Sequence, residues 1–469
     1  MKSKEVSIDL SNKILLVEKR KRRDAAGQHL PSASHLAVWS GSDAFDAFAP
    51  VDVGVGETAA SEEADSSEKR PGSVAAPRTA DGMFGYRYVT RQQLAGFDLY
   101  KYNAVDTNPL SVYVMQNLWN RIVKAVPLWI APNLLTFTGF LLILLNYFLL
   151  AYYDWNYTSS SSGSRHAPKW VWGLTGLTTF SAYALDSVDG KHARRTCSSS
   201  PLGELFDHGL DSWATSLFTL SFFSVFGLSA EREVTPFTLY YILCIILFTF
   251  MLSHWEKYNT GVLFLPWGYD ISQVTLTAVY VLTAIYGVEA WHKPLMFGYF
   301  FADILIAMVI GCSVFLSLPQ TLYNIYQAKK LGTLQRNSIS EGLLPLLSPT
   351  LLFLLLTTWA KISPEDILTK NPRIFLWMVG VTFSNVTCRL IVCQMTKTRS
   401  EVIHWLLIPL AGTVGAVYMG LEVHSEFALL TGFTLLVTVA HVHYGICVGK
   451  QLSEYFNIFI FSLEKRRLD

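Results

Sequence analysis

Long apolar stretches separated by short polar loops make up most of the chain after residue 127. Ten stretches are each near the ~20 residues that an α-helix needs to cross the hydrocarbon core of a bilayer. They cover residues 128–153, 170–185, 210–230, 236–253, 271–288, 296–318, 343–360, 374–395, 403–421 and 427–448. The pattern predicts an all-α integral membrane protein with about ten transmembrane helices, followed by a tail at residues 449–469.

The segment before the first stretch, residues 83–127, has a different pattern. Asn108-Pro109 is a typical helix start, with Asn as the cap and Pro at the first helical position. The apolar ridge that follows consists of Leu110, Val114, Leu118 and Ile122. We expect an amphipathic helix that lies on the membrane surface; a core helix of a small soluble segment is the alternative.

Residues 1–82 hold no long apolar run and carry 24 of the 73 charged residues. A short apolar run precedes the basic cluster at residues 19–23, which is the reverse of the order in a signal peptide. The composition predicts a disordered N-terminal extension. Contact of the basic cluster with anionic lipid or with an import receptor is the alternative.

The overall composition agrees with a membrane protein. Charged residues make up 16% of the 469 residues, against about 25% in soluble domains, and about 13% of the chain after residue 82. The net charge of +1 argues against a nucleic-acid partner, because binding phosphates requires a clustered basic surface. The six cysteines form no C-x2-C pair, which argues against a zinc site or a disulfide framework.

Loop charge predicts the orientation. The loops that follow the second, fourth, sixth and eighth stretches, together with the C-terminal tail, carry 13 Lys and Arg residues, whereas the opposite loops carry 7. The positive-inside rule therefore places the first set in the cytosol. A glycosylation sequon at residues 156–158 then faces the lumen, where it can be modified.

Two pairs of acidic residues lie between the second and third stretches. Asp186 and Asp189 are three residues apart, and Asp207 and Asp211 are four apart. On helices each pair shares one face, so two neighbouring helical segments can bring four carboxylates together. Four such charges at the edge of a bilayer repel one another unless cations neutralise them. Oxygen ligands suit Mg²⁺, Mn²⁺ or Ca²⁺, and two ions balance the charge.

The residues around these acids fit a phosphate-containing substrate. Gly190 and Gly203 allow close approach to the backbone, and Arg194 and Arg195 offer guanidinium groups to phosphate oxygens. Such a set can support in-line displacement at a pyrophosphate. A solvated loop explains one acidic pair, but the complete spacing D-x2-D-G-x2-A-R-x8-G-x3-D-x3-D arises by chance with a probability on the order of 10⁻⁷.

This spacing is the signature of the CDP-alcohol phosphotransferase family, also called the class I CDP-alcohol phosphatidyltransferases, which the chain resembles from about residue 85 to 463. The resemblance implies that the four acids, Asp186, Asp189, Asp207 and Asp211, hold two Mg²⁺ or Mn²⁺ ions. It also implies substrate contacts from Asn133, Gly190, Arg194, Gly203 and Glu204. Capping of the first membrane helix is the alternative role of Asn133.

His208 is the candidate catalytic residue. Asp207-His208-Gly209 resembles the choline and ethanolamine phosphotransferase branch of the family, in which this His is the proposed proton acceptor. A lipid hydroxyl is a poor nucleophile, and a neutral imidazole can take its proton. A role as partner to a metal ligand or at a helix end is the alternative, and Asp211 is a competing but weaker base.

A second group of candidates lies at residues 254–258. His254 or Glu256 can assist proton transfer or hold the alcohol head group. A belt of Trp, Tyr and Lys at the membrane interface explains the same segment without catalysis, and we favour this interpretation.

Residues 93–98, 101–102, 104–109, 253–261 and 263–270 resemble the animal ethanolamine phosphotransferase branch of the family. The resemblance implies transfer of phosphoethanolamine from CDP-ethanolamine to diacylglycerol or an alkyl- or alkenyl-acylglycerol, which gives phosphatidylethanolamine and CMP. It also implies an endoplasmic reticulum or Golgi membrane, a cytosolic active site and a homodimer. CDP-choline, alone or with CDP-ethanolamine, is the nearest alternative. A multi-span cation-coupled transporter is the alternative from another class, although its ion site is expected near the middle of the membrane.

Overall fold

The computed structural model describes residues 83–158, 167–228, 234–266, 268–295, 298–336, 338–420 and 423–464. The predicted N-terminal extension at residues 1–82 lies outside the described residues, as do the last five residues of the chain.

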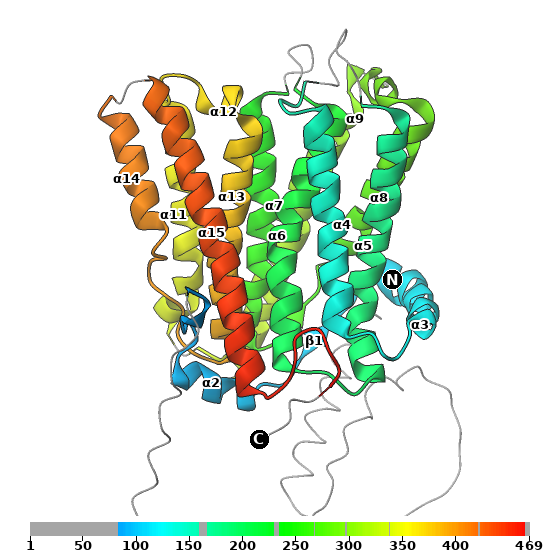
Figure 1. Cartoon of the computed structure of the whole chain (residues 1–469), viewed down its shortest axis with the longest axis vertical. Helices are drawn as coiled ribbons and strands as arrows, with labels where there is room; N and C mark the ends of the chain where they lie inside the picture. The colour runs from blue at the N-terminus through cyan, green and yellow to red at the C-terminus, as the bar shows by residue number, and fades with distance from the viewer. Residues whose placement is uncertain are drawn as a thin grey trace, which may run out of the picture. The chain divides into compact units, whose positions relative to one another are not determined.

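Helices occupy all ten positions that the apolar stretches predict, and they run side by side as a bundle (Figure 1). Their bounds are α4 Pro132–Tyr153, α5 Lys169–Arg195, α6 Pro201–Phe226, α7 Pro236–Thr260, α8 Gly268–Tyr286, α9 Phe301–Gly311 continued by η5 Cys312–Ser317 and α10 Leu318–Lys330, α11 Ile339–Ile362, α13 Pro372–Met395, α14 Leu407–Tyr418 and α15 Val423–Tyr455. Among the described residues, six helical segments are long and apolar enough to cross a membrane. The all-α prediction is confirmed, and ten crossings stay a prediction.

Local sequence explains where the helices near the acidic residues begin and end. Ser200 caps α6, since its hydroxyl accepts a hydrogen bond from the Gly203 backbone N at 3.1 Å, and Pro201 follows at the first helical position. Thr235 and Thr238 form a reciprocal cap at the start of α7. Gly261 ends α7 with a left-handed φ of 74°, a conformation that glycine adopts without strain.

The segment before α4 contains the predicted helix. Its residues are helical without a break from Pro109 through η2, Ser111–Met115, and α3, Gln116–Ala125. The Asn108 side chain accepts a hydrogen bond from the Leu110 backbone N at 3.0 Å, so the predicted cap is confirmed. Two short helices, η1 Met83–Gly85 and α2 Arg91–Asp98, precede it and were not predicted.

The most deeply buried face of this helix lies next to the predicted ridge, of which Leu110, Leu118 and Ile122 are partly buried against the same core cluster. Met115, Trp119 and Val123 are buried, whereas Val114 of the predicted ridge is 55% exposed. Trp119 packs edge-to-face on Tyr183 of α5, with ring centroids 4.9 Å apart. The most buried ridge is thus shifted by one residue from the predicted ridge, because the position of α5 decides which side chains of this helix pack against the bundle.

A short parallel pair of strands joins this segment to the start of α8. β1, Ala104–Val105, pairs with β2, Leu263–Phe264. The backbone N of Leu263 donates to the Asn103 carbonyl at 2.9 Å. Residues about 160 positions apart in the sequence are therefore held together next to α7.

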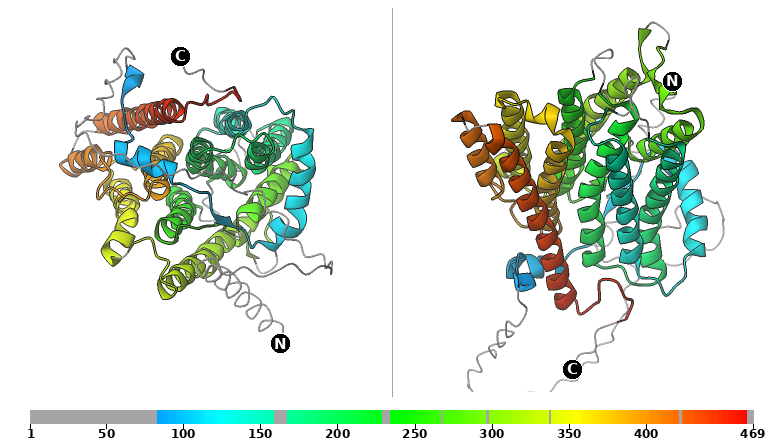
Figure 2. Two further views of the ribbon diagram at one scale, coloured as in Figure 1. Left: turned by 90° about the horizontal axis from the view of Figure 1, so that it is seen from below. Right: turned by 45° about the horizontal axis from the view of Figure 1, so that its top comes forward.

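α13 lies inside the bundle, in contact with α6, α7, α11 and α15 (Figure 2). Most of its side chains are buried, including Arg373, Ser384 and Asn385, which are polar. Gly380 permits a close crossing with α6, since a Cβ atom added there would lie 2.6 Å from the Ser216 Cβ atom.

Loops that the charge bias predicts to share one side meet at the same end of the bundle. The Ser400 backbone N donates to the Tyr258 hydroxyl at 3.1 Å, and the Gln335 backbone N donates to the Asn259 carbonyl at 2.8 Å. At the opposite end, the Arg373 guanidinium donates to the Asp154 carbonyl at 2.8 Å. α15 continues to Tyr455, so the predicted tail begins inside a helix.

Candidate active site

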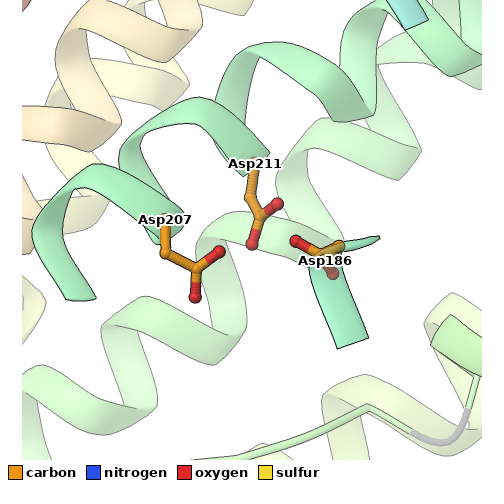
Figure 3. Close-up of side chains that lie close together, drawn as sticks. All are labelled: Asp186, Asp207 and Asp211. Carbon is orange, nitrogen blue, oxygen red and sulfur yellow. The ribbon is translucent and has the colours of Figure 1, made fainter. Parts of the chain in front are cut away.

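Three of the four predicted acidic ligands converge. Asp186 projects from α5, and Asp207 and Asp211 project from successive turns of α6 (Figure 3). One carboxylate oxygen from each lies within 4.8 Å of the others. The predicted loop between the second and third spans is therefore short, because both acidic pairs belong to the long helices themselves.

The cluster has the chemistry of a divalent-cation site. In the described part of the chain, no Lys or Arg lies within ion-pair distance of Asp186, Asp207 or Asp211. Asp207 Oδ1 is buried and has no hydrogen-bond partner there. Clustered carboxylates with a free buried oxygen leave negative charge that a hard cation can neutralise. The residues thus fit Mg²⁺ or Mn²⁺.

Asp189 is not one of the three residues whose carboxylate oxygens lie within 4.8 Å of one another. Its carboxylate is buried and accepts a hydrogen bond from the Thr136 hydroxyl on α4. No local pattern singles out this partner, since Thr136 is one of several polar residues in an apolar helix.

His208 follows Asp207 on α6, and its imidazole lies near Glu204, Asp207 and His254. Its Nδ1 atom is 3.9 Å from Glu204 Oε1, and its Nε2 atom is 3.9 Å from Asp207 Oδ2. The His254 ring of α7 packs edge-on against it, with centroids 5.7 Å apart. The imidazole is therefore adjacent to the acidic cluster and is held between two helices.

Glu204 belongs to a buried ion pair that the sequence did not predict. Lys257 Nζ lies 2.7 Å from Glu204 Oε1 and 2.8 Å from the Tyr100 hydroxyl, and Tyr100 itself donates to Glu204. Burial and the adjacent Glu204 carboxylate raise the pKa of Tyr100 above its usual range, so the phenol keeps its proton.

The favoured interpretation of residues 254–258 as an interfacial belt is wrong. Trp255, Lys257 and Tyr258 are all buried, and the Trp255 indole donates to the Gly342 carbonyl at 2.7 Å. Helix packing buries this end of α7, whereas a belt would leave its residues at the membrane surface.

His254 and Glu256 point in different directions from α7. The His254 Nδ1 atom lies 3.0 Å from the Gln394 amide nitrogen, on the side of His208. Glu256 instead accepts hydrogen bonds from Thr321 and Asn324 of α10, at 2.8 and 2.7 Å. The structure thus brings His254 toward the candidate site and takes Glu256 away from it.

The two arginines predicted to bind phosphate, Arg194 and Arg195, lie in different surroundings. Arg194 extends over Gly190, since a Cβ atom added to Gly190 would lie 3.8 Å from its guanidinium. Arg195 instead donates to the carbonyls of Val123 and Val126, at 2.6 and 2.7 Å, and so anchors the end of α3. The prediction that Arg195 is a free phosphate ligand is not supported.

Asn133 has neither a capping role nor a free amide. Ala131 is the cap residue of α4, and the Asn133 amide donates to the Ile460 carbonyl at 2.9 Å. Its Oδ1 faces Gly203, where an added Cβ atom would lie 3.3 Å away. The beginnings of α4 and α6 therefore meet beneath the C-terminal segment.

A cavity of about 390 Å³ opens beside this site. Tyr100 and Lys257, the partners of Glu204, line it together with Tyr102 and Gln394. The three converging carboxylates are not part of its lining. The cavity therefore lies against the two side chains that bind Glu204, at the end of the bundle where the predicted cytosolic loops lie.

Comparison with known proteins gives consistent similarities. The model of the CDP-alcohol phosphatidyltransferase family matches residues 129–320. Human ethanolaminephosphotransferase 1 is 54% identical over 82% of this chain and 97% of the human protein, and the mouse protein of that name is 53% identical over the same shares. Choline/ethanolaminephosphotransferase 2 of Arabidopsis thaliana is 28% identical over 81% of this chain and 99% of its own length.

Proposed function

Because the chain belongs to the CDP-alcohol phosphatidyltransferase family, we propose that it is a membrane-embedded ethanolaminephosphotransferase. It transfers phosphoethanolamine from CDP-ethanolamine to diacylglycerol or an alkyl- or alkenyl-acylglycerol, giving phosphatidylethanolamine and CMP. The observation that carries this proposal is the 54% identity that extends over 97% of human ethanolaminephosphotransferase 1. The match to the family model, over residues 129–320, includes the signature at residues 186–211.

In the proposed reaction the lipid hydroxyl oxygen bonds to the phosphorus that carries ethanolamine. The bond between that phosphorus and the bridging oxygen breaks, and CMP leaves with the electron pair. Asp186, Asp207 and Asp211, with Asp189 adjacent on α5, would hold Mg²⁺ or Mn²⁺. When bound, such ions neutralise pyrophosphate charge and stabilise the leaving group.

His208 is the proposed acceptor of the hydroxyl proton. Its position beside Asp207 and its packing against His254 support this role, because a base must lie next to the reacting atoms in a fixed orientation. His208→Ala is expected to abolish CMP release while CDP-ethanolamine still binds, as measured by equilibrium binding to the purified protein. A near-normal rate would remove His208 from the mechanism.

Residues next to the acidic cluster are the proposed contacts for CDP-ethanolamine. Glu204, Gly203 and Gly190 lie at the facing ends of α5 and α6, with Arg194 above Gly190. We propose that Arg194 binds a phosphate oxygen and that Asn133 reaches the nucleotide. His254 supports His208, whereas Glu256 serves the contact between α7 and α10.

The site is proposed to face the cytosol, in an endoplasmic reticulum or Golgi membrane, in a homodimer. The excess of Lys and Arg in the loops at its end of the bundle supports the orientation. CDP-ethanolamine would then arrive from the cytosol and diacylglycerol from the bilayer.

The decisive assay uses purified protein in detergent with diacylglycerol and Mg²⁺ or Mn²⁺, and measures CMP release from CDP-ethanolamine and from CDP-choline. Preferential turnover of CDP-ethanolamine is expected. The similarity to Arabidopsis choline/ethanolaminephosphotransferase 2 makes dual use the second candidate, which equal rates would support. No CMP from either donor would refute the enzyme assignment. Family membership leaves the transporter alternative without support.

A further inference from the structure

The Tyr269 side chain connects α8 to the acidic cluster. Its hydroxyl donates to Asp186 Oδ2 at 2.7 Å. Within the described part of the chain, Asp186 is the one member of the converging trio, with Asp207 and Asp211, whose carboxylate accepts from the side chain of another helix. This bond occupies one oxygen of Asp186 and leaves the other available.

Neighbouring contacts fix the position of Tyr269. The next residue, Asp270, is buried and accepts hydrogen bonds from the Tyr183 hydroxyl of α5 and from the Asn108 amide, the latter at 3.2 Å. The Tyr183 and Tyr269 rings pack edge-to-face, with centroids 5.9 Å apart. The strand β2 immediately upstream is paired with β1. Contacts from three segments therefore hold the first turn of α8 against α5.

We infer that Tyr269 is a positioning residue for the metal-binding carboxylate of Asp186. A carboxylate rotates about its Cβ–Cγ bond, and the hydrogen bond from Tyr269 to Oδ2 restricts that rotation. Partners of this kind orient metal ligands, and their loss typically lowers metal affinity about 10- to 100-fold. The inference rests on the proposed function, because it assumes that the cluster binds a divalent cation.

If Tyr269 only stabilised the fold, its replacement would lower the stability of the metal-free protein. Tyr269 is 37% exposed, so replacing it with Phe removes the hydroxyl without opening a cavity in the core. Stability of the metal-free protein should therefore change little, whereas metal affinity should fall.

The test measures Mn²⁺ binding to purified, substrate-free protein by electron paramagnetic resonance of free Mn²⁺. Tyr269→Phe is expected to weaken binding about 10- to 100-fold. Tyr286→Phe is the matched control, since this tyrosine belongs to the same helix and is 69% exposed. It should bind Mn²⁺ as the unaltered protein does. In CMP release, the half-saturating Mn²⁺ concentration should rise by the same factor, with the maximal rate recovered at high Mn²⁺.

Asp270→Asn provides a second variant in case Tyr269→Phe does not fold. It weakens the bonds to Tyr183 and Asn108 but keeps the Tyr269 hydroxyl, so a smaller loss of Mn²⁺ affinity is expected. Unchanged Mn²⁺ affinity in the folded Tyr269→Phe protein, or in Asp270→Asn if only that variant folds, overturns the inference. If the unaltered protein binds no Mn²⁺, the metal site of the proposed function fails, which is a distinct result.

Discussion

Replacing Asp207 with Asn is expected to stabilise the metal-free protein while it abolishes turnover. Asp207 lies with Asp186 and Asp211 in a cluster whose carboxylate oxygens are within 4.8 Å of one another. At an effective dielectric constant of about 20, two unit charges at that distance repel each other by about 3.5 kcal/mol. The substitution removes two such repulsions, about 7 kcal/mol in total if all three groups are ionised.

The net gain is smaller than this sum. Bound protons and salt already relieve part of the repulsion in the metal-free cluster, which leaves about 1–3 kcal/mol of stabilisation near neutral pH. One kcal/mol corresponds to a rise in Tm of roughly 2–4 °C in domains of 150–250 residues. The gain should shrink as the pH falls, because protonation removes the same repulsion from the unaltered protein.

The assay is thermal unfolding in detergent, first with a chelator and then with excess Mg²⁺. With the chelator, Asp207→Asn should have the higher Tm; with Mg²⁺, only the unaltered protein should gain stability, and CMP release should be lost in the variant. Glu454→Gln, at an exposed position of α15, is the control for removal of one negative charge. A lower Tm with chelator, together with a retained response to Mg²⁺, would refute the electrostatic argument.

Two further substitutions test the packing around the site by thermal unfolding. Lys257→Met should destabilise the protein by about 3–5 kcal/mol because it leaves the Glu204 carboxylate buried without its ion pair. Adding Glu204→Gln should restore part of the loss, and no recovery would contradict this explanation. Gly380→Ala should cost about 1–3 kcal/mol, since the new Cβ atom would lie 2.6 Å from the Ser216 Cβ atom. Gly432→Ala on α15, where no atom lies within 4 Å of the added Cβ, should cost much less, and equal costs would argue against the close crossing.

The positions of the helices and the chemistry of the acidic cluster could be predicted from local sequence. Apolar runs about 20 residues long specify helices wherever their neighbours lie. Spacings of three and four residues put Asp186 with Asp189, and Asp207 with Asp211, on single helix faces. Both patterns involve residues within a few turns of one helix, so they can be recognised from the sequence alone.

The contacts between helices could not be predicted in this way. The Trp, Tyr and Lys at residues 254–258 are typical of a membrane interface, but the packing of α7 buries Lys257 against Glu204. Similarly, Asp189 turns to Thr136 of α4. Such partners lie 53 positions apart in each case, and no local pattern specifies which helices will be adjacent.

The sequence alone determined the class of protein, the approximate helices, the acidic signature and the family, because each depends on residue type and spacing along the chain. Tertiary structure decided which carboxylates converge, which ridge of α3 is buried and which partners hold the site residues. Tyr269 illustrates the difference, since it lies 83 positions from Asp186 and acquires its role only where α8 packs against α5. Side-chain interactions act only over a few ångströms, so which residues interact depends on how the helices are placed in space.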